Sequence, residues 1–168
     1  MRPVVADTGP LNYLILIEAV DVLPRLFSPI LIPSGVRDEL SHPKAPTLVR
    51  SWTGHPPAWL NIVSLGSVPA TGPSALDHGE RQAIALAVQQ QADILIDDRE
   101  GVLQARKMNL EAIGTLAVLV RAAQRGWIQL PEMFRRLRAT SFRSPVHLMA
   151  RMLEEDSLRK KQLGGPIL

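Results

Sequence analysis

Short apolar runs alternate with helical patterns along most of the chain, and this alternation constrains the fold more than any other feature. Five apolar runs are expected to form strands, at residues 3–6, 30–32, 60–64, 94–96 and 112–113. The segments between them have helical spacing, and the clearest of these helices spans residues 77–91. Strands that alternate with helices predict a mainly parallel sheet with helices on both faces, a three-layer α/β/α sandwich.

The remaining helical patterns extend beyond the last expected strand. They span residues 10–19, 22–27, 34–40, 99–108, 115–125, 131–139 and 146–160. Residues 41–57 contain four prolines and are expected to form a loop with one helical turn near 48–52, and residues 66–74 are expected to form a second loop. We therefore expect an α/β domain over residues 1–128 and a basic helical extension, packed on or beside it, over residues 129–168.

Composition excludes several classes of protein. The chain has 168 residues and no cysteine, which excludes a disulfide scaffold, a thiol nucleophile and a cysteine zinc site. The uncharged apolar stretch at residues 112–120 is too short to span a bilayer, and the N-terminus lacks the apolar region of a signal peptide. We expect a soluble, cytoplasmic protein with no membrane association.

Charge is distributed unevenly along the chain. Residues 1–100 contain 7 basic and 11 acidic residues, a net charge of −4, whereas residues 101–168 contain 12 and 5, a net charge of +7. This division is compatible with an acidic site beside a surface for an anionic partner, and equally with a solvated basic helical tail.

Acidic residues follow two of the expected strands. Asp7 ends the first strand, and Asp97 and Asp98 follow the strand at 94–96. Functional groups in parallel sheets collect outside the carboxyl ends of the strands, where Glu39 and Glu80 could join them from nearby helices. Carboxylates gathered at one place need a cation, and Mg²⁺ or Mn²⁺ suits their hard oxygen atoms and can activate water for phosphoryl displacement.

Each of these acids also has a structural explanation. The spacing of Asp77 and Glu80 at the start of a helix is typical of a capping box. Asp97 or Asp98 could cap the helix that begins at residue 99, and Glu39 could be a solvated helical acid. Asp7 is harder to explain structurally, because a charge at the end of a buried strand is costly without a role.

Four segments within residues 3–128 occur in the order found in one protein family. They read VVADTGPLNYL, LIPSGVRDEL, LDHGERQAIALA and ADILIDDREGVLQARKMNLEAIGTLAVLVRAAQRGWI. No single motif is specific, but their combination resembles the PIN domain, in the branch related to VapC-type toxins. The resemblance implies an α/β/α sandwich, a Mg²⁺- or Mn²⁺-dependent ribonuclease, and the toxin of a type II toxin–antitoxin pair. It also implies a homodimer that binds an antitoxin protein.

The resemblance assigns roles to the acidic residues. The acidic quartet of the family corresponds here to Asp7, Glu39, Glu80 and Asp98. Asp7 and Asp98 are expected to bind the metal most directly, and Glu39 and Glu80 to bind a second ion or hold its waters. Thr8 matches a polar position that could orient Asp7.

One departure concerns the fourth acid. Ile96 stands where other PIN domains often have a small polar residue, which leaves open whether Asp97 or Asp98 faces the metal. Arg99, Arg106 and Lys107 follow closely and are expected to bind phosphates of an RNA substrate.

Two other functions compete with the ribonuclease hypothesis. One is a PIN-like scaffold that binds RNA or protein without cleavage. The other is a metal-dependent phosphatase of the haloacid-dehalogenase type, which requires a second aspartate where this chain has Gly9.

The nearly apolar first helix is expected to be either buried or part of a dimer or antitoxin interface. Its apolar residues include Leu11, Leu14, Ile15 and Ile17.

Overall fold

A computed structural model describes residues 1–68 and 75–164. The described chain forms two compact units, Met1–Thr115 and Leu116–Leu168. The boundary expected near residue 128, between an α/β domain and a basic helical extension, stays a prediction. Part of the loop expected at 66–74 lies outside the described residues.

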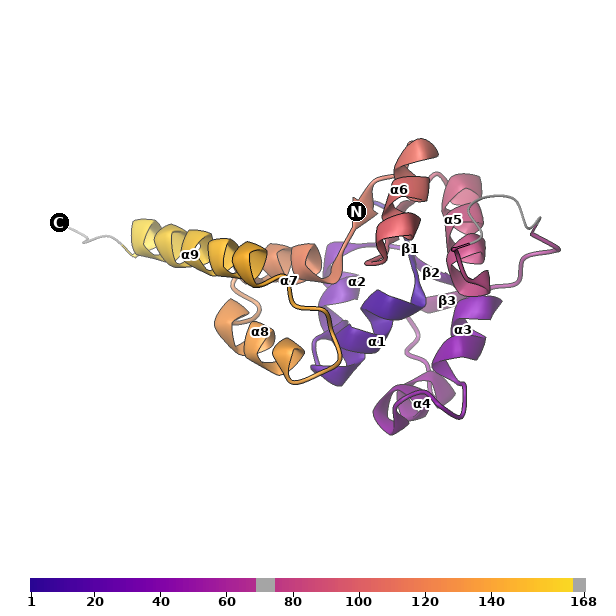
Figure 1. The fold of residues 1–168 in the computed structure, drawn as a ribbon, viewed down its shortest axis with the longest axis horizontal. Coiled ribbons are helices and arrows are strands. Elements are labelled where there is room, and N and C mark those ends of the chain that lie inside the picture. The colour runs from indigo at the N-terminus through magenta and orange to yellow at the C-terminus, as the bar shows by residue number, and fades with distance from the viewer. Residues whose placement is uncertain (69–74, 165–168) are drawn as a thin grey trace. The chain divides into compact units, whose positions relative to one another are not determined.

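The first unit contains a five-stranded sheet in which every neighbouring pair is parallel (Figure 1). Its strands are β1 (Val4–Ala6), β2 (Ile30–Pro33), β3 (Leu60–Val63), β4 (Asp93–Leu95) and β5 (Ala112–Ile113). The strand order is β3-β2-β1-β4-β5, so the chain moves outward from β1 in one direction and then crosses to the other side. Right-handed connections in such a sheet place the helices of the two halves on opposite faces. The predicted α/β class is confirmed.

The helices of the first unit occupy the intervals between strands. They are α1 (Thr8–Leu16), the 3-10 helix η1 (Val20–Val22), α2 (Leu23–Leu26), α3 (Ser34–Leu40), α4 (Thr47–Gly54), α5 (His78–Gln90) and α6 (Arg99–Lys107). Helix α5 packs against β1, β2 and β4, and α3 lies beside α5 (Figure 1).

Helix α4 is longer than the single turn that was predicted. The prolines flank this helix instead of interrupting it, since Pro46 immediately precedes it and Pro56 lies beyond its end. Val49 and Thr53 are both buried, and their spacing of four residues places them on one face. The helical turn predicted near 48–52 is therefore present, but it belongs to a helix longer than was predicted.

Burial of apolar side chains stabilises the sheet and the first helix. The side chains of β1 are fully buried, and each fully buried Val or Leu contributes about 1.5–3 kcal/mol. In α1, the side chains of Leu11 and Leu14 are 0 % exposed, and Ile15 is also buried. These residues are buried in the described chain, and α1 packs against α3 and α4 of its own unit.

The described residues of the second unit form three helices with both buried apolar and polar side chains. Helix α7 spans Thr115–Gln124, with its first residue in the first unit, α8 spans Leu130–Arg138, and α9 spans Val146–Leu163. The guanidinium of Arg159 donates to the carbonyl of Ala123 at 3.2 Å and to buried Asp156 at 2.8 Å. The bond to Ala123 holds α9 against the end of α7, where the last carbonyls of a helix need donors, and the bond to Asp156 lies within α9.

Candidate active site at the carboxyl ends of the strands

The central strands β1 and β4 define the point where the sheet connections diverge. Ala6 pairs with Leu95, and the backbone N–H of Asp7 donates to the Leu95 carbonyl at 2.9 Å. The chain leaves β1 toward β2 and leaves β4 toward β5, on opposite sides. Ligands of parallel α/β sheets bind in the crevice at such a point, so Asp7 stands at the expected place for a site.

Asp7 is a buried carboxylate with an unsatisfied oxygen. Its side chain makes no capping hydrogen bond to α1, and its Oδ1 has no hydrogen-bond partner among the described residues. Burial raises the pKa of Asp7 to about 8 against the opposing effect of the Thr8 backbone N–H, and the charges of Glu80, Asp77 and Glu39 raise it further. An acid in this environment needs either a proton or a cation.

Glu80 lies in the first turn of α5, where the predicted capping box is present. Oδ1 of Asp77 accepts from the Glu80 backbone N–H at 2.8 Å, and Oε2 of Glu80 accepts from the Asp77 N–H at 3.0 Å. Burial raises the pKa of Glu80 to about 6 although the Asp77 N–H lowers it, and the charges of Asp77, Asp98 and Glu39 add to the increase. The cap uses one oxygen, so Glu80 can cap the helix and also face the other acids.

Glu39 connects three helices. Its Oε1 accepts from the backbone N–H of Gly79 at 3.0 Å, and its Oε2 accepts from the hydroxyl of Thr8. The side chain therefore links α3 to the first turns of α1 and α5.

Asp97 and Asp98 point to different partners. Both oxygens of Asp97 accept hydrogen bonds from Thr115, whereas Oδ2 of Asp98 accepts from the backbone N–H groups of Glu100 and Gly101. Asp98 is thus the N-cap of α6, as one of the sequence alternatives proposed. The charge of Asp98 contributes to the raised pKa of Glu80, so the two carboxylates are close enough to interact electrostatically.

These carboxylates have the chemistry of a site for a hard divalent cation. Within residues 1–68 and 75–164, no hydrogen bond reaches Oδ1 of Asp7, Oε1 of Glu80 or Oδ1 of Asp98. In that same part of the chain, no three acidic or histidine side chains are arranged so that together they could hold a metal ion. The orphaned Asp7 oxygen and the mutual repulsion of the acids fit a divalent ion, which would compensate both.

The three predicted phosphate-binding residues lie at opposite ends of α6. Arg99 is the first residue of the helix, next to Asp98, and it is exposed. Arg106 and Lys107 are in the last turn, and a rise of 1.5 Å per residue puts Lys107 about 12 Å along the axis from Arg99. Of these three residues, only Arg99 is therefore adjacent to the acidic edge. This name denotes the acids Asp7, Glu39, Glu80 and Asp98 at the carboxyl ends of the strands.

Part of the basic charge of the second unit is already paired. Arg135 and Arg136 both contact Glu132, at 2.7 and 2.9 Å. Lys160 contacts Asp156 at 2.8 Å. These residues are less available to an anionic partner than the charge count suggested.

Sequence reasoning missed the residues that support the acids. A Cβ on Gly79 would lie 2.5 Å from Oε1 of Glu39, so a side chain there would displace the Glu39 carboxylate. Gln82 accepts from the backbone N–H of Gly35 at 2.8 Å, and a Cβ on Gly35 would collide with the Gln82 amide. The glycine directly before Glu80 was the available signal for a close approach.

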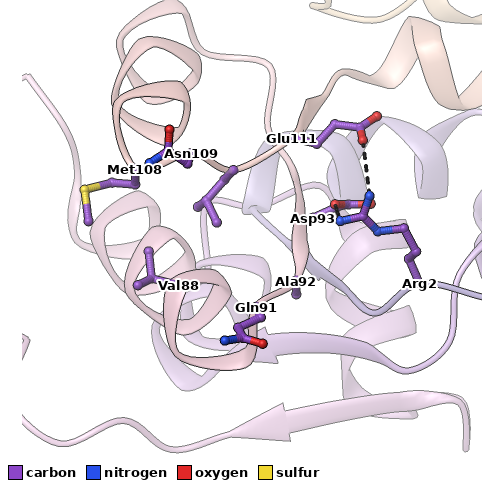
Figure 2. A pocket seen from close by; sticks show the side chains of 9 residues that line it. Arg2, Val88, Gln91, Ala92, Asp93, Met108, Asn109 and Glu111 are labelled. Atoms are coloured by element: carbon purple, nitrogen blue, oxygen red, sulfur yellow. Dashed lines mark ion pairs between the residues drawn. The ribbon is translucent and has the colours of Figure 1, made fainter.

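A separate pocket lies at the amino ends of β4 and β5, at the opposite end of the strands from the acids described above. It is a cavity of about 230 Å³ near Asp93, the first residue of β4, and near Glu111, which precedes β5. Arg2 contacts Asp93 at 2.9 Å and Glu111 at 3.8 Å, and Figure 2 shows its guanidinium between them. This ion pair is distant from the acids that follow β1 and β4.

Comparison with known proteins identifies the family. The model of the PIN domain matches residues 3–157, nearly the whole chain. The chain belongs to the PIN domain family. Proteins of this family are usually metal-dependent nucleases and bind nucleic acid, which agrees with the acidic edge of this PIN domain.

A solved structure supports the fold of this PIN domain. It is a PilT N-terminus domain protein from the hyperthermophilic archaeon Sulfolobus solfataricus P2, with a TM-score of 0.51 and 14% sequence identity. The match covers 73% of this chain and 93% of the archaeal protein. No curated protein matches the chain. Within the described residues of this PIN domain, no helix has the length and apolar character needed to cross a membrane.

Proposed function

We propose that this PIN domain is an endoribonuclease that depends on Mg²⁺ or Mn²⁺ and hydrolyses RNA phosphodiesters with water. The observation that carries the proposal is the buried Oδ1 of Asp7, which has no partner in the described chain and lies where the sheet connections diverge. A hard cation would compensate this charge, and a nuclease of this kind needs such an ion.

The four acids differ in whether they retain a carboxylate oxygen that is available to bind the ion. Asp7, Glu80 and Asp98 each retain an oxygen that accepts no hydrogen bond from the described chain, and these three would hold the ion. When bound, the ion would lower the pKa of a coordinated water and neutralise charge on the phosphate.

Arg99 would hold the substrate. Arg99 is the first residue of the helix that Asp98 caps, and its side chain is exposed. The guanidinium can therefore bind a phosphate oxygen beside the acids. Burial of Asp7 keeps bulk water away from the carboxylate and strengthens its electrostatic interactions.

The biological part of the proposal is a toxin of a type II toxin–antitoxin system. It is supported by the order of the acidic motifs in residues 3–128 and by the family match. A cytoplasmic location, a cognate antitoxin and a homodimer belong to the same proposal. The apolar residues of α1 are buried in the described chain, so a dimer would use another surface.

The test compares three proteins on labelled single-stranded RNA with Mn²⁺. They are the wild type, Asp7→Asn and the control Asp38→Asn, which removes an equal charge from an exposed acid one residue away from Glu39. We expect cleavage by the wild type and the control, and none by Asp7→Asn or in EDTA.

Three other outcomes would decide against the ribonuclease. Equal cleavage by wild type and Asp7→Asn would indicate a contaminating nuclease. RNA binding by the wild type without cleavage would favour the non-cleaving scaffold, and hydrolysis of a small phosphate ester alone would favour a phosphatase.

A further inference from the structure

We propose that Glu39 is a positioning residue and not a metal ligand: its carboxylate fixes the helix starts that carry Asp7 and Glu80. This inference rests on the proposed function, because it concerns the same acidic edge. It assigns to Glu39 a role different from that of the other three acids.

The hydrogen bonds of Glu39 use both of its oxygens. Oε2 accepts from the Thr8 hydroxyl and Oε1 from the Gly79 backbone N–H. Thr8 directly follows Asp7, and Gly79 directly precedes Glu80. One contact therefore fixes the residue next to Asp7, and the other fixes the residue next to Glu80. Asp7 and Glu80 each retain an oxygen that accepts no hydrogen bond from the described chain.

The packing of α3 against α5 restricts the movement of this carboxylate. Gly35 contacts Gln82 and Glu39 contacts Gly79, so the residue numbers run in opposite directions and the two helices are antiparallel. At Gly79 the carboxylate fits against a backbone without a Cβ. Glu39 and Gln82 thus each accept a backbone N–H from the first turn of the other helix, in a reciprocal arrangement.

The other three acids differ from Glu39 in this respect. Glu80 and Asp98 each use a single oxygen for capping, and Oδ1 of Asp7 has no partner in the described part of the chain. A turn of Glu39 toward a cation would break at least one of its two bonds and release Thr8 or Gly79. The contacts therefore favour a role for Glu39 in orienting Asp7 and Glu80. Residues outside the ligand shell are known to tune metal sites in this way.

The experiment measures Mn²⁺ binding in the absence of RNA, by calorimetry and by the electron paramagnetic resonance signal of free Mn²⁺. The conservative variant Glu39→Gln can keep both bonds, because its amide oxygen accepts from Gly79 and its amide N–H₂ donates to the Thr8 hydroxyl. We expect it to retain Mn²⁺ affinity within about threefold of the wild type, as the control Asp38→Asn does.

The variant Glu39→Ala removes the hydrogen bonds to both Thr8 and Gly79, and Thr8→Val removes the bond between Thr8 and Glu39. Both are expected to lose about 10–100-fold in Mn²⁺ affinity, the usual effect of removing a group that orients ligands. Thr8→Val leaves every carboxylate in place and preserves side-chain volume, so it remains informative if Glu39→Ala fails to fold. Melting temperatures identify variants that are unfolded.

The outcomes separate this inference from the proposed function. Loss of affinity in Glu39→Gln as large as in Asp7→Asn would overturn the inference and make Glu39 a ligand, as would unchanged affinity in Thr8→Val. Mn²⁺ binding in the predicted pattern without RNA cleavage would reject only the ribonuclease. A wild type that binds no Mn²⁺ would reject both.

Discussion

Both carboxylate oxygens of Asp97 accept hydrogen bonds from Thr115, one from its backbone N–H at 2.8 Å and one from its hydroxyl at 2.6 Å. Thr115 is fully buried and begins α7. Asp97 therefore holds the turn after β5, whereas its neighbour Asp98 caps α6 and keeps one oxygen open. Two adjacent acids thus have separable functions.

Substitution of Asp97 is expected to affect stability more than metal binding. Asp97→Ala leaves the N–H and hydroxyl of Thr115 without acceptors, and each buried unsatisfied group costs about 1–3 kcal/mol. Asp98→Ser retains a capping oxygen, so the free energy of unfolding should change by less than about 1 kcal/mol while Mn²⁺ affinity falls. Urea unfolding and Mn²⁺ titration measure the two effects. Weaker Mn²⁺ binding in Asp97→Ala than in Asp98→Ser would reverse these assignments.

The stability of the metal-free protein should depend on pH through Asp7. Its pKa is about 8 in the folded chain and ordinarily 3.8, so the folded state binds this proton more tightly. The resulting stabilisation is complete below about pH 4 and is lost as pH rises toward 8. Each unit of pKa difference corresponds to about 1.4 kcal/mol, so the loss amounts to several kcal/mol.

The variant Asp7→Asn isolates this effect, because asparagine resembles a protonated aspartate. In EDTA, its free energy of unfolding should match that of the wild type near pH 4 and exceed it at pH 8. Addition of Mn²⁺ at pH 8 should stabilise the wild type only, since ligand binding to the folded state raises stability. Parallel stability curves for the two proteins in EDTA would contradict the raised pKa of Asp7.

The sequence predicted the positions of the acids because those positions depend on local order. Asp7 ends an apolar run, and the spacing of Asp77 and Glu80 specifies a capping box that the structure contains. Helix α1 begins at Thr8 and not at residue 10, because Asp7 takes the N-cap position in extended conformation. That difference brings the Thr8 hydroxyl to Glu39.

The contacts between distant segments could not be predicted from the sequence. Glu39 and Gly79 are 40 residues apart, and their contact depends on the antiparallel packing of α3 and α5. By contrast, the separation of Arg99 and Lys107 follows from the helix predicted at 99–108, because eight residues of helix span about 12 Å. Spacing along the chain therefore establishes positions within a helix but not the packing of one helix on another.

Gly101 is expected to be intolerant of a side chain. A Cβ there would collide with the Cδ1 of Ile96, which is fully buried, and overpacking of this kind costs about 1–3 kcal/mol. Gly54 has no atom within 4 Å of its Cβ position, so Gly54→Ala is the matched control and should be neutral or slightly stabilising. Thermal unfolding compares the two, and equal melting temperatures would contradict the packing at Ile96.

Arg99 should contribute more to RNA binding than Lys107, although both are exposed cations of α6. Arg99 adjoins Asp98, whereas Lys107 lies about 12 Å farther along the helix, away from a phosphate bound beside the acids and their metal ion. Binding of single-stranded RNA is measured by fluorescence anisotropy with Ca²⁺ in place of Mn²⁺, so that cleavage does not interfere. Arg99→Ala should weaken binding and reduce the slope of log affinity against log salt by about 0.7, as the loss of one phosphate contact requires. Lys107→Ala should leave that slope unchanged. The opposite ranking would place the RNA along the far end of α6 and away from the acidic edge.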